Sequence, residues 1–286
     1  MDQASKLKGE VEKKKFGNRP TKVIAITSGK GGVGKTQVTA NLALSLRARG
    51  KEVLIFDGDM GLANIDIIYN ISPPYNLQHL LSGQKTIHEV IFNGPDGVKV
   101  LAASSGVQEL TQMSADNKRS LIDQLDQLEG VFDYVLIDTA AGISDNVMYL
   151  NSASQFICVV VTPEPTSITD AYALMKVLST RYGEKTFQII TNQCASEAEG
   201  INIFKSLVNA ADQFLENVQL WHLHSFPHDL KVRQSITRQK PVIKFDEDGE
   251  MAKSYKELAR KVEGLEVDTR KAAGMQFFVR QALGTK

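Results

Sequence analysis

The residues with the clearest chemistry form a glycine-rich run that ends in a lysine and a threonine. The run matches the pattern G-x-x-x-x-G-K-[ST] and comprises Gly29, Lys30, Gly31, Gly32, Val33, Gly34, Lys35 and Thr36. Glycines let successive backbone N–H groups point at one anion, and a helix N-terminus beyond them adds partial positive charge. We expect Lys35 to reach the β- and γ-phosphates of a nucleotide and Thr36 to ligate Mg²⁺. The run predicts a phosphate-binding loop; the alternative is a plain glycine-rich turn.

Carboxylates follow two of the apolar runs. Asp57 and Asp59 come after Val53–Phe56, and Asp138 comes after Tyr134–Ile137. An aspartate at a strand end commonly caps a helix or forms a turn. At the sheet edge that carries a phosphate loop, however, carboxylates can hold the waters of Mg²⁺ and orient an attacking water. The aspartates therefore predict hydrolysis; a non-enzymatic scaffold would leave them all idle.

These side chains need an edge at which strands end and helices begin. Continuous apolar runs bounded by turn residues predict strands buried on both faces, at Val23–Ile26, Val53–Phe56, Val98–Leu101, Tyr134–Ile137, Phe156–Val161, Phe187–Ile190 and Leu220–Phe226. Helical patterns occur at Thr36–Arg49, Asp116–Leu128, Ser144–Ala153, Ser167–Tyr182, Glu197–Leu215, Leu230–Arg238 and Met251–Val262. This alternation predicts an α/β fold with an open, mostly parallel sheet and helices on both faces.

Lys30 sets the loop apart, because a second lysine stands five residues before Lys35. With it, the run resembles the deviant Walker A motif of the MinD/ParA family of dimerising P-loop ATPases. The resemblance implies ATP and Mg²⁺ as cofactors and hydrolysis of ATP to ADP and phosphate. It also implies an ATP-bound homodimer in which Lys30 reaches the partner's nucleotide. The alternative for Lys30 is a solvated surface lysine.

The same resemblance assigns roles to the aspartates. Asp138 resembles the Walker B aspartate, and Asp59 resembles the switch I aspartate that positions the attacking water. Asp57 would support the Mg²⁺ shell. The implied metal-binding residues are thus Thr36, Asp57 and Asp138, with the carboxylates acting through water, and the implied catalytic residues are Asp59, Lys30 and Lys35.

Further nucleotide contacts follow from the resemblance. Asn192 corresponds to a base-reading asparagine, although a satisfied turn residue is the alternative. Glu164 resembles the residue that reaches the partner's nucleotide. The segment Phe226-Pro227-His228-Asp229 matches the loop whose backbone frames the base. Outside the phosphate loop, the resemblance therefore implies six nucleotide-binding residues, which are Gln37, Glu164, Asn192, Pro227, His228 and Asp229. We expect no metal site at the histidines around this loop, because no carboxylate or cysteine completes a ligand set.

Composition limits the class of protein. The chain has 286 residues, of which 42% are hydrophobic and 23% charged, as in a soluble globular protein. Its 33 basic and 33 acidic residues cancel, which disfavours broad electrostatic binding to nucleic acid. Two cysteines without metal-type spacing favour a reducing cytoplasm. The sequence shows neither an apolar stretch of the ~20 residues that span a bilayer nor a signal peptide.

The two ends of the chain differ from its middle. Residues 1–20 are polar and lysine-rich and predict a flexible arm, residues 21–263 an ATPase domain, and residues 264–286 a linker with an amphipathic helix. An apolar stripe on the last segment predicts membrane contact through Met275, Phe277, Phe278, Val279 and Leu283. One copy should bind weakly and two copies on a dimer much better. The alternative is that the stripe docks on its own domain or on a partner.

Three features are similar to the flagellar-number branch of the family, known as FlhG, FleN or YlxH. They are the motif Asp57-Gly58-Asp59-Met60-Gly61-Leu62-Ala63-Asn64, the run that starts at Glu164-Pro165-Thr166, and the start Asp2-Gln3-Ala4, where Lys8 replaces the usual Arg. The resemblance implies that Gln3 helps stimulate an FlhF-like GTPase.

The resemblance to this branch implies further partners and a location. The partners are flagellar C-ring proteins, a flagellar transcriptional activator and the inner-membrane lipid surface. The location is the cytoplasm, with peripheral attachment to the inner face of the membrane at the pole. The alternatives are a septum-placing MinD, which normally lacks the arm, and a ParA-type DNA-segregation ATPase, which would need a basic surface.

Overall fold

The computed structural model describes residues 21–59, 64–102, 124, 128 and 130–267. The predicted arm with Gln3, the membrane segment from Met275 to Leu283 and nearly all of the predicted helix Asp116–Leu128 lie outside the described residues. The account of the fold concerns the described part alone.

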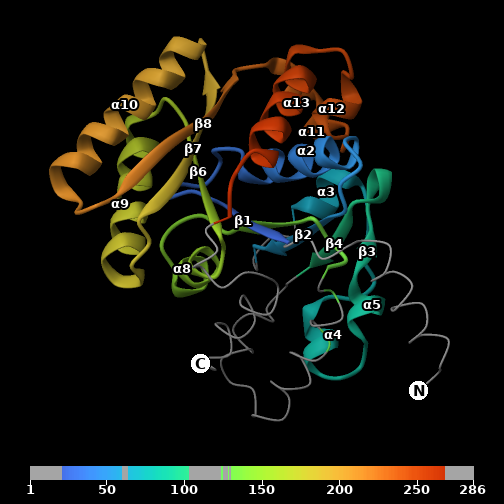
Figure 1. The fold of residues 1–286 in the computed structure, drawn as a ribbon. Helices are drawn as coiled ribbons and strands as arrows, with labels where there is room; N and C mark the ends of the chain where they lie inside the picture. Colours follow the sequence, from blue (N-terminus) through green and yellow to red (C-terminus); the bar gives the residue numbers. More distant parts are fainter. Residues whose placement is uncertain (1–20, 60–63, 103–123, 125–127, 129, 268–286) are drawn as a thin grey trace.

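One sheet of eight strands runs through the described part of the chain, in the order β3-β4-β2-β5-β1-β6-β7-β8 (Figure 1). The strands are β1 (Lys22–Thr27), β2 (Val53–Gly58), β3 (Phe92–Asn93), β4 (Lys99–Ala102), β5 (Tyr134–Thr139), β6 (Phe156–Val161), β7 (Thr186–Cys194) and β8 (Gln219–Pro227). Every neighbouring pair is parallel except β3 and β4, which are antiparallel. The predicted fold class, an open and mostly parallel sheet, is confirmed.

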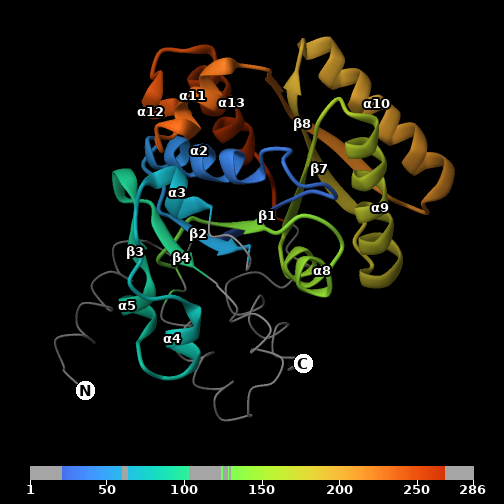
Figure 2. The same ribbon diagram turned by 180° about the vertical axis from the view of Figure 1, so that it is seen from behind.

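Helices cover both faces of this sheet (Figures 1 and 2). The described helices are α2 (Lys35–Arg47), α3 (Ile65–Tyr69), α4 (Leu77–Leu81), α5 (Ile87–Val90), α8 (Asp145–Ser152), α9 (Pro165–Tyr182), α10 (Glu197–Phe214), α11 (Leu230–Thr237), α12 (Val242–Phe245) and α13 (Glu250–Glu263), with a 3₁₀ turn at Pro95–Gly97. The clusters of buried side chains place α2 and α13 on one face and α8, α9 and α10 on the other. The central strand β1 therefore ends between two helical layers.

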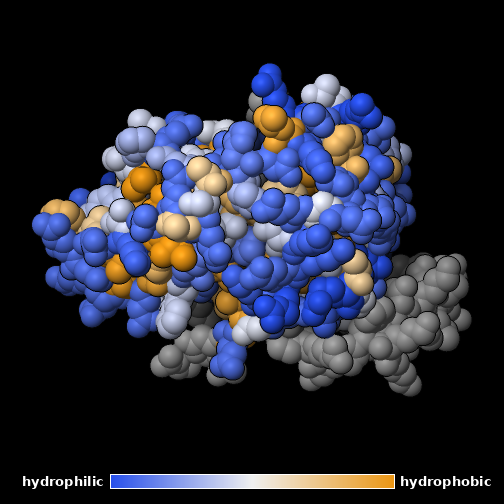
Figure 3. Space-filling view, turned by 90° about the horizontal axis from the view of Figure 1, so that it is seen from above, coloured by the Kyte–Doolittle hydropathy of each residue, from blue (hydrophilic) through white to orange (hydrophobic). Residues whose placement is uncertain are grey.

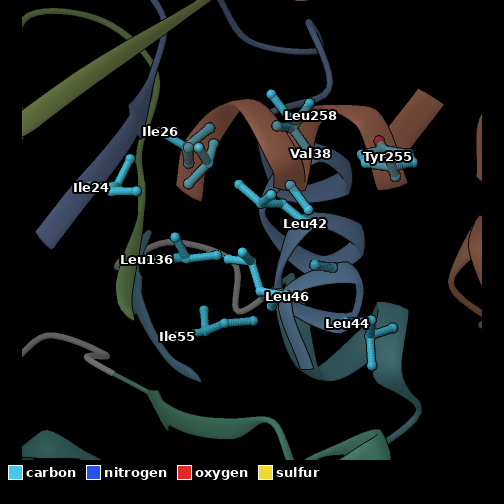
Figure 4. Close-up of a cluster of buried hydrophobic side chains, with 14 of the residues drawn as sticks. Ile24, Ile26, Val38, Leu42, Leu44, Leu46, Ile55, Leu136, Tyr255 and Leu258 are labelled. Atoms are coloured by element: carbon cyan, nitrogen blue, oxygen red, sulfur yellow. The ribbon is translucent and has the colours of Figure 1, made fainter. Parts of the chain in front are cut away.

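The core beneath α2 and α13 is mostly aliphatic, with the aromatic side chains of Tyr69, Tyr134, Phe226 and Tyr255 among it. Figure 4 shows Val38 and Leu42 of α2 directed toward Ile26 of β1, with Leu258 of α13 above them. These four side chains are fully buried. Burying a side chain of this size contributes roughly 1.5–3 kcal/mol. The packing fixes α2, and with it the loop that precedes α2, against the centre of the sheet.

The end of α13 is tied to the beginning of β1. The ammonium of Lys22 donates to the carbonyl oxygens of Glu263 at 2.8 Å and of Leu265 at 2.6 Å. Arg49 and Lys51 add ion pairs with the Glu263 carboxylate. The last described residues thus lie at the amino ends of the central strands.

The surface seen from above is mostly hydrophilic with small apolar groups (Figure 3). Among the residues that the structure describes, the exposed large apolar side chains are Ile67, Ile143, Tyr182, Phe214, Trp221, Leu230 and Ile236. None of the helices in the described ranges is both long and apolar enough to cross a bilayer.

A buried histidine joins β8 to α13. The Nε2 atom of His224 lies 2.6 Å from the hydroxyl of Ser254, and its ring packs edge-on against Phe226. Burial, followed by the charge of Lys261, lowers the pKa of His224 to about 4 against the opposing effect of Glu257. The pKa of His224 is thus lower in the folded chain than in the unfolded chain. As the pH falls from the unfolded pKa toward 4, the unfolded chain takes up a proton that the folded chain does not, and the folded state loses stability.

We expect acid to weaken the fold through His224. Between pH ~6.5 and ~4 the free energy of unfolding should fall by up to about 3 kcal/mol on this account. The His224→Gln variant should lose less stability over the same interval, as measured by urea unfolding at pH 7 and pH 4.5. His88→Gln, at an exposed position, serves as the control. Equal pH dependence in wild type and His224→Gln would contradict the prediction.

Candidate functional site

The phosphate loop lies between the central strand and a buried helix. Strand β1 ends at Thr27, and α2 begins at Lys35 directly after Gly34, whose φ of 93° is left-handed. Gly32 also has a left-handed φ, of 79°, a conformation that glycine adopts without strain. Figure 2 shows the dark-blue segment before α2 running beside α9 and β7. The predicted order of strand, loop and helix is present, so backbone N–H groups at the start of α2 are available to an anion.

Two aspartates stand side by side at this edge. Asp57 of β2 and Asp138 of β5 are directly paired in the parallel register, and Asp138 also neighbours Ile26 of β1. Their exposed fractions are only 2% and 0%. Burial, followed by the charge of Asp138, raises the pKa of Asp57 to about 8. Burial also raises the pKa of Asp138 to about 7, against the opposing effects of a Thr36 hydrogen bond and the Lys35 charge.

Lys35 lies among these acids. It is only 8% exposed. Burial lowers the pKa of its ammonium, while the nearby charges of Asp138 and Asp59 oppose that shift. Thr39, one helical turn later, places its hydroxyl 3.4 Å from a carboxylate oxygen of Asp138. The sequence analysis missed Thr39, although its spacing of four residues from Lys35 puts it on the same face of α2.

The acids and the hydroxyl fit a magnesium ion. The Oδ2 atom of Asp138 is buried without a hydrogen-bond partner among the described residues, which is costly unless a ligand or water satisfies it. Thr36 hydrogen-bonds the same carboxyl group, and Asp57 lies on the adjacent strand. Hard oxygen donors of this kind suit Mg²⁺. Thr36, Asp57 and Asp138 would hold the ion directly or through its waters, and the bound ion would offset phosphate charge.

Hydrogen bonds link the segments after β2 and β5 to this site. The Asp57 carboxylate accepts the backbone N–H groups of Asp59 at 3.3 Å and Ile65 at 3.4 Å. The N–H of Gly142, four residues after Asp138, donates to the Ser28 carbonyl at 2.9 Å. Both segments are therefore in contact with residues that a bound phosphate or metal would touch.

Lys30 is bonded within its own chain. Its ammonium pairs with the Glu164 carboxylate and donates a hydrogen bond to the Thr166 hydroxyl at 2.9 Å, at the start of α9. Lys30 and Glu164 both remain partly exposed. The predicted roles of both residues across a dimer stay predictions. Thr166 had no distinguishing signal in the sequence, because its contact depends on how α9 packs against the loop.

Among the predicted base-side residues, Asn192 contacts the phosphate loop directly. The side-chain amide of Asn192 donates to the Val33 carbonyl at 2.8 Å. His228 donates its backbone N–H to the Cys194 carbonyl at 2.8 Å, and the Asp229 carboxylate caps α11 by accepting the Lys231 N–H.

Gln37 and two histidines of β8 contact residues outside the phosphate loop. The carbonyl of Gln37 accepts hydrogen bonds from Asn41 at 2.8 Å and from the Tyr255 hydroxyl at 3.3 Å, which ties the first turn of α2 to α13. His222 and His224 contact Ser225 and Ser254, respectively. Within the described ranges, no group of three or more His, Cys, Asp or Glu side chains is placed to hold a metal ion.

Comparisons with known proteins agree with this geometry. A family model named ParA, described as a NUBPL iron-transfer P-loop NTPase, matches residues 19–263. The antiactivator FleN of Pseudomonas aeruginosa is 37% identical over 262 residues, covering 92% of this chain and 93% of FleN. The flagellum site-determining protein YlxH of Helicobacter pylori is 34% identical, covering 84% of this chain and 81% of its own.

A solved structure extends the likeness to three dimensions. A chain of the MinC:MinD cell division complex of Aquifex aeolicus has a TM-score of 0.70 at 25% identity, covering 89% of this chain and 100% of that one. Because the family model and both relatives extend over most of the sequence, we conclude that this chain belongs to the ParA family of P-loop NTPases, in the branch of FleN and YlxH, and is an ATPase.

Proposed function

We propose that the protein is an ATP-dependent switch that regulates flagellar number and placement. In this proposal, ATP with Mg²⁺ binds the phosphate loop and two copies close face to face over two nucleotides. Hydrolysis loosens the pair and returns the chain to a monomer. The flagellar role rests on the names of the relatives FleN and YlxH, an antiactivator and a flagellum site-determining protein.

One observation carries the switch: the segments after Asp57 and Asp138 are hydrogen-bonded to the site itself, through Asp59, Ile65 and Gly142. A γ-phosphate and its Mg²⁺ compete for the same carboxylates and loop atoms. Occupancy of the γ-phosphate position would therefore rearrange both segments, which is how nucleotide state is commonly converted into a change of surface. Lys30, beside this surface, would exchange Glu164 for the partner's phosphates.

The test of the switch is the oligomeric state. We expect light scattering to give twice the monomer mass with a slowly hydrolysed ATP analogue and the monomer mass with ADP. Lys30→Ala should remain monomeric with either nucleotide, because it lacks the cation that would cross to the partner. Lys205→Ala, at an exposed lysine of α10, should behave as wild type. The same mass in all nucleotide states would refute the switch.

The proposal includes reversible membrane attachment through Met275, Phe277, Phe278, Val279 and Leu283. Pairing two weak apolar segments raises their combined affinity far above that of either one. We expect the full chain to pellet with anionic liposomes in ATP and to stay in solution in ADP. A chain ending at Gly274 should stay in solution with both. Equal pelleting of the truncated and full chains would remove the membrane role from this segment.

Partners of the switch are proposed on the same basis. Gln3 in the N-terminal arm would stimulate an FlhF-like GTPase, and the monomer would bind flagellar C-ring proteins and a flagellar transcriptional activator. Attachment to the inner face of the membrane at the pole would combine these activities at one place. Direct binding to nucleic acid is not part of the proposal, because 33 basic and 33 acidic residues leave no net charge.

A further inference from the structure

Asn192 bridges the end of β7 and the phosphate loop with both ends of its side-chain amide. Its Nδ2 atom donates to the Val33 carbonyl at 2.8 Å, and its Oδ1 atom accepts the backbone N–H of Gln193 at 2.9 Å. An amide group carries two donors on nitrogen and an acceptor on oxygen. Turning the amide over would place oxygen against the Val33 carbonyl and nitrogen against the Gln193 N–H, so both bonds would be lost. The two contacts therefore fix the orientation of the amide.

The backbone after Asn192 is shaped to hold that orientation. Gln193 has a φ of 61°, a left-handed conformation that is uncommon for a residue with a side chain. Its N–H donates to the preceding side chain, and its left-handed φ turns the chain that follows. The same turn continues to Cys194, whose carbonyl accepts the N–H of His228 at 2.8 Å. A continuous set of hydrogen bonds thus joins the phosphate loop, the end of β7 and the segment after β8.

The contact lies where the loop is tightest. Gly34 has a φ of 93°, and a Cβ added there would stand 2.5 Å from Nδ2 of Asn192. Gly34 directly precedes Lys35 and the first turn of α2. In a trans peptide the C=O and the following N–H point in opposite directions. Holding the Val33 carbonyl toward Asn192 therefore turns the Gly34 N–H to the opposite side, away from Asn192.

We propose that Asn192 is a positioning residue for the phosphate loop, which it holds in its phosphate-binding form through the Val33–Gly34 peptide. This role is separate from any contact with adenine, and it rests on the proposed nucleotide site. It concerns a loop conformation that exists before the nucleotide arrives. A residue that only reads the base would have no influence on the loop of the nucleotide-free protein.

Inosine triphosphate carries a carbonyl where adenine carries the exocyclic amine, so a bond from that amine cannot account for a loss of its binding. We expect Asn192→Ala to weaken the binding of inosine triphosphate about two- to tenfold, the range that one net hydrogen bond provides. ATP binding should weaken at least as much. Hydrogen exchange of the nucleotide-free protein should become faster in peptides covering residues 29–36, while the core strands β1 and β5 keep their protection.

Ser225→Ala is the matched control. The Ser225 hydroxyl joins Thr191 at 2.8 Å and His222 at 2.9 Å across the same strand ends, and neither contact involves the loop. This variant should bind inosine triphosphate as wild type does. Equal losses in Ser225→Ala and Asn192→Ala would mean a general loosening and would overturn the inference.

Two other results bear on the inference. It fails if Asn192→Ala binds inosine triphosphate as tightly as wild type or leaves exchange in the loop unchanged. A wild-type protein that bound neither nucleotide would instead overturn the nucleotide site on which the proposed function stands.

Discussion

Replacing Lys35 with alanine should lower ATP hydrolysis by at least about a hundredfold, the loss that follows removal of one preorganised donor in a site of this kind. Lys35 is 8% exposed and lies beside Asp138 and Asp59. Its charge is only weakly screened there, so it acts strongly on a triphosphate. Without it, the aspartates would repel the nucleotide. ATP binding, measured by titration calorimetry, should weaken in parallel.

The fold of this variant should survive the loss of a buried cation. Burial already raises the pKa of Asp57 to about 8 and that of Asp138 to about 7, so these groups can take up a proton. Circular dichroism should therefore match wild type at pH 7. Lys35→Arg is the informative companion, because it keeps the charge but changes its shape and its hydrogen-bond geometry. Hydrolysis at the wild-type rate by Lys35→Ala would mean that the loop does not bind the reacting phosphates.

Asp59→Ala should separate binding from hydrolysis. Asp59 follows β2 at the edge of the site, and its backbone N–H is held by the carboxylate of Asp57. If its side chain orients the attacking water, its loss should lower single-turnover hydrolysis by about a hundredfold. ATP affinity should change only a few-fold, because the phosphate contacts of the loop and Lys35 remain. The ATP-bound dimer should then persist in light scattering for as long as ATP is present.

Asp66→Ala is the control for that experiment. Asp66 lies in the first turn of α3, and its carboxylate accepts the N–H of Ile67 instead of facing the loop. It should hydrolyse ATP at the wild-type rate. Unchanged hydrolysis in Asp59→Ala would show that another group orients the water.

Much of the site could be predicted from the sequence because parallel strands impose it. Once Val53–Phe56 and Tyr134–Ile137 are strands of one parallel sheet, the aspartates that follow them reach the same edge as the loop after β1. Burial on both faces made these strands visible as unbroken apolar runs. The observed pairing of Asp57 with Asp138 follows from that register.

The remaining features depend on distances that a sequence does not contain. The helices α3, α4, α5 and α12 have four or five residues each, too few for a helical period to stand out. The antiparallel strand β3 has two residues and was likewise missed. The contacts of Lys30 with Thr166 and of Asn192 with Val33 span 136 and 159 positions. Such contacts arise when segments far apart in the sequence pack together, so no local sequence pattern predicts them.

The anchorage of α13 by Lys22 has a consequence for how ATP could act on the end of the chain. Lys22 opens β1, whereas the nucleotide loop follows its last residue, so the two lie about 20 Å apart along a six-residue strand. Val267, the last described residue, therefore starts the tail on the side of the molecule remote from the γ-phosphate. The point at which the tail leaves the described domain is therefore not in contact with the phosphate loop. In the proposed switch, ATP would instead act on the tail by changing the number of tails that one particle carries.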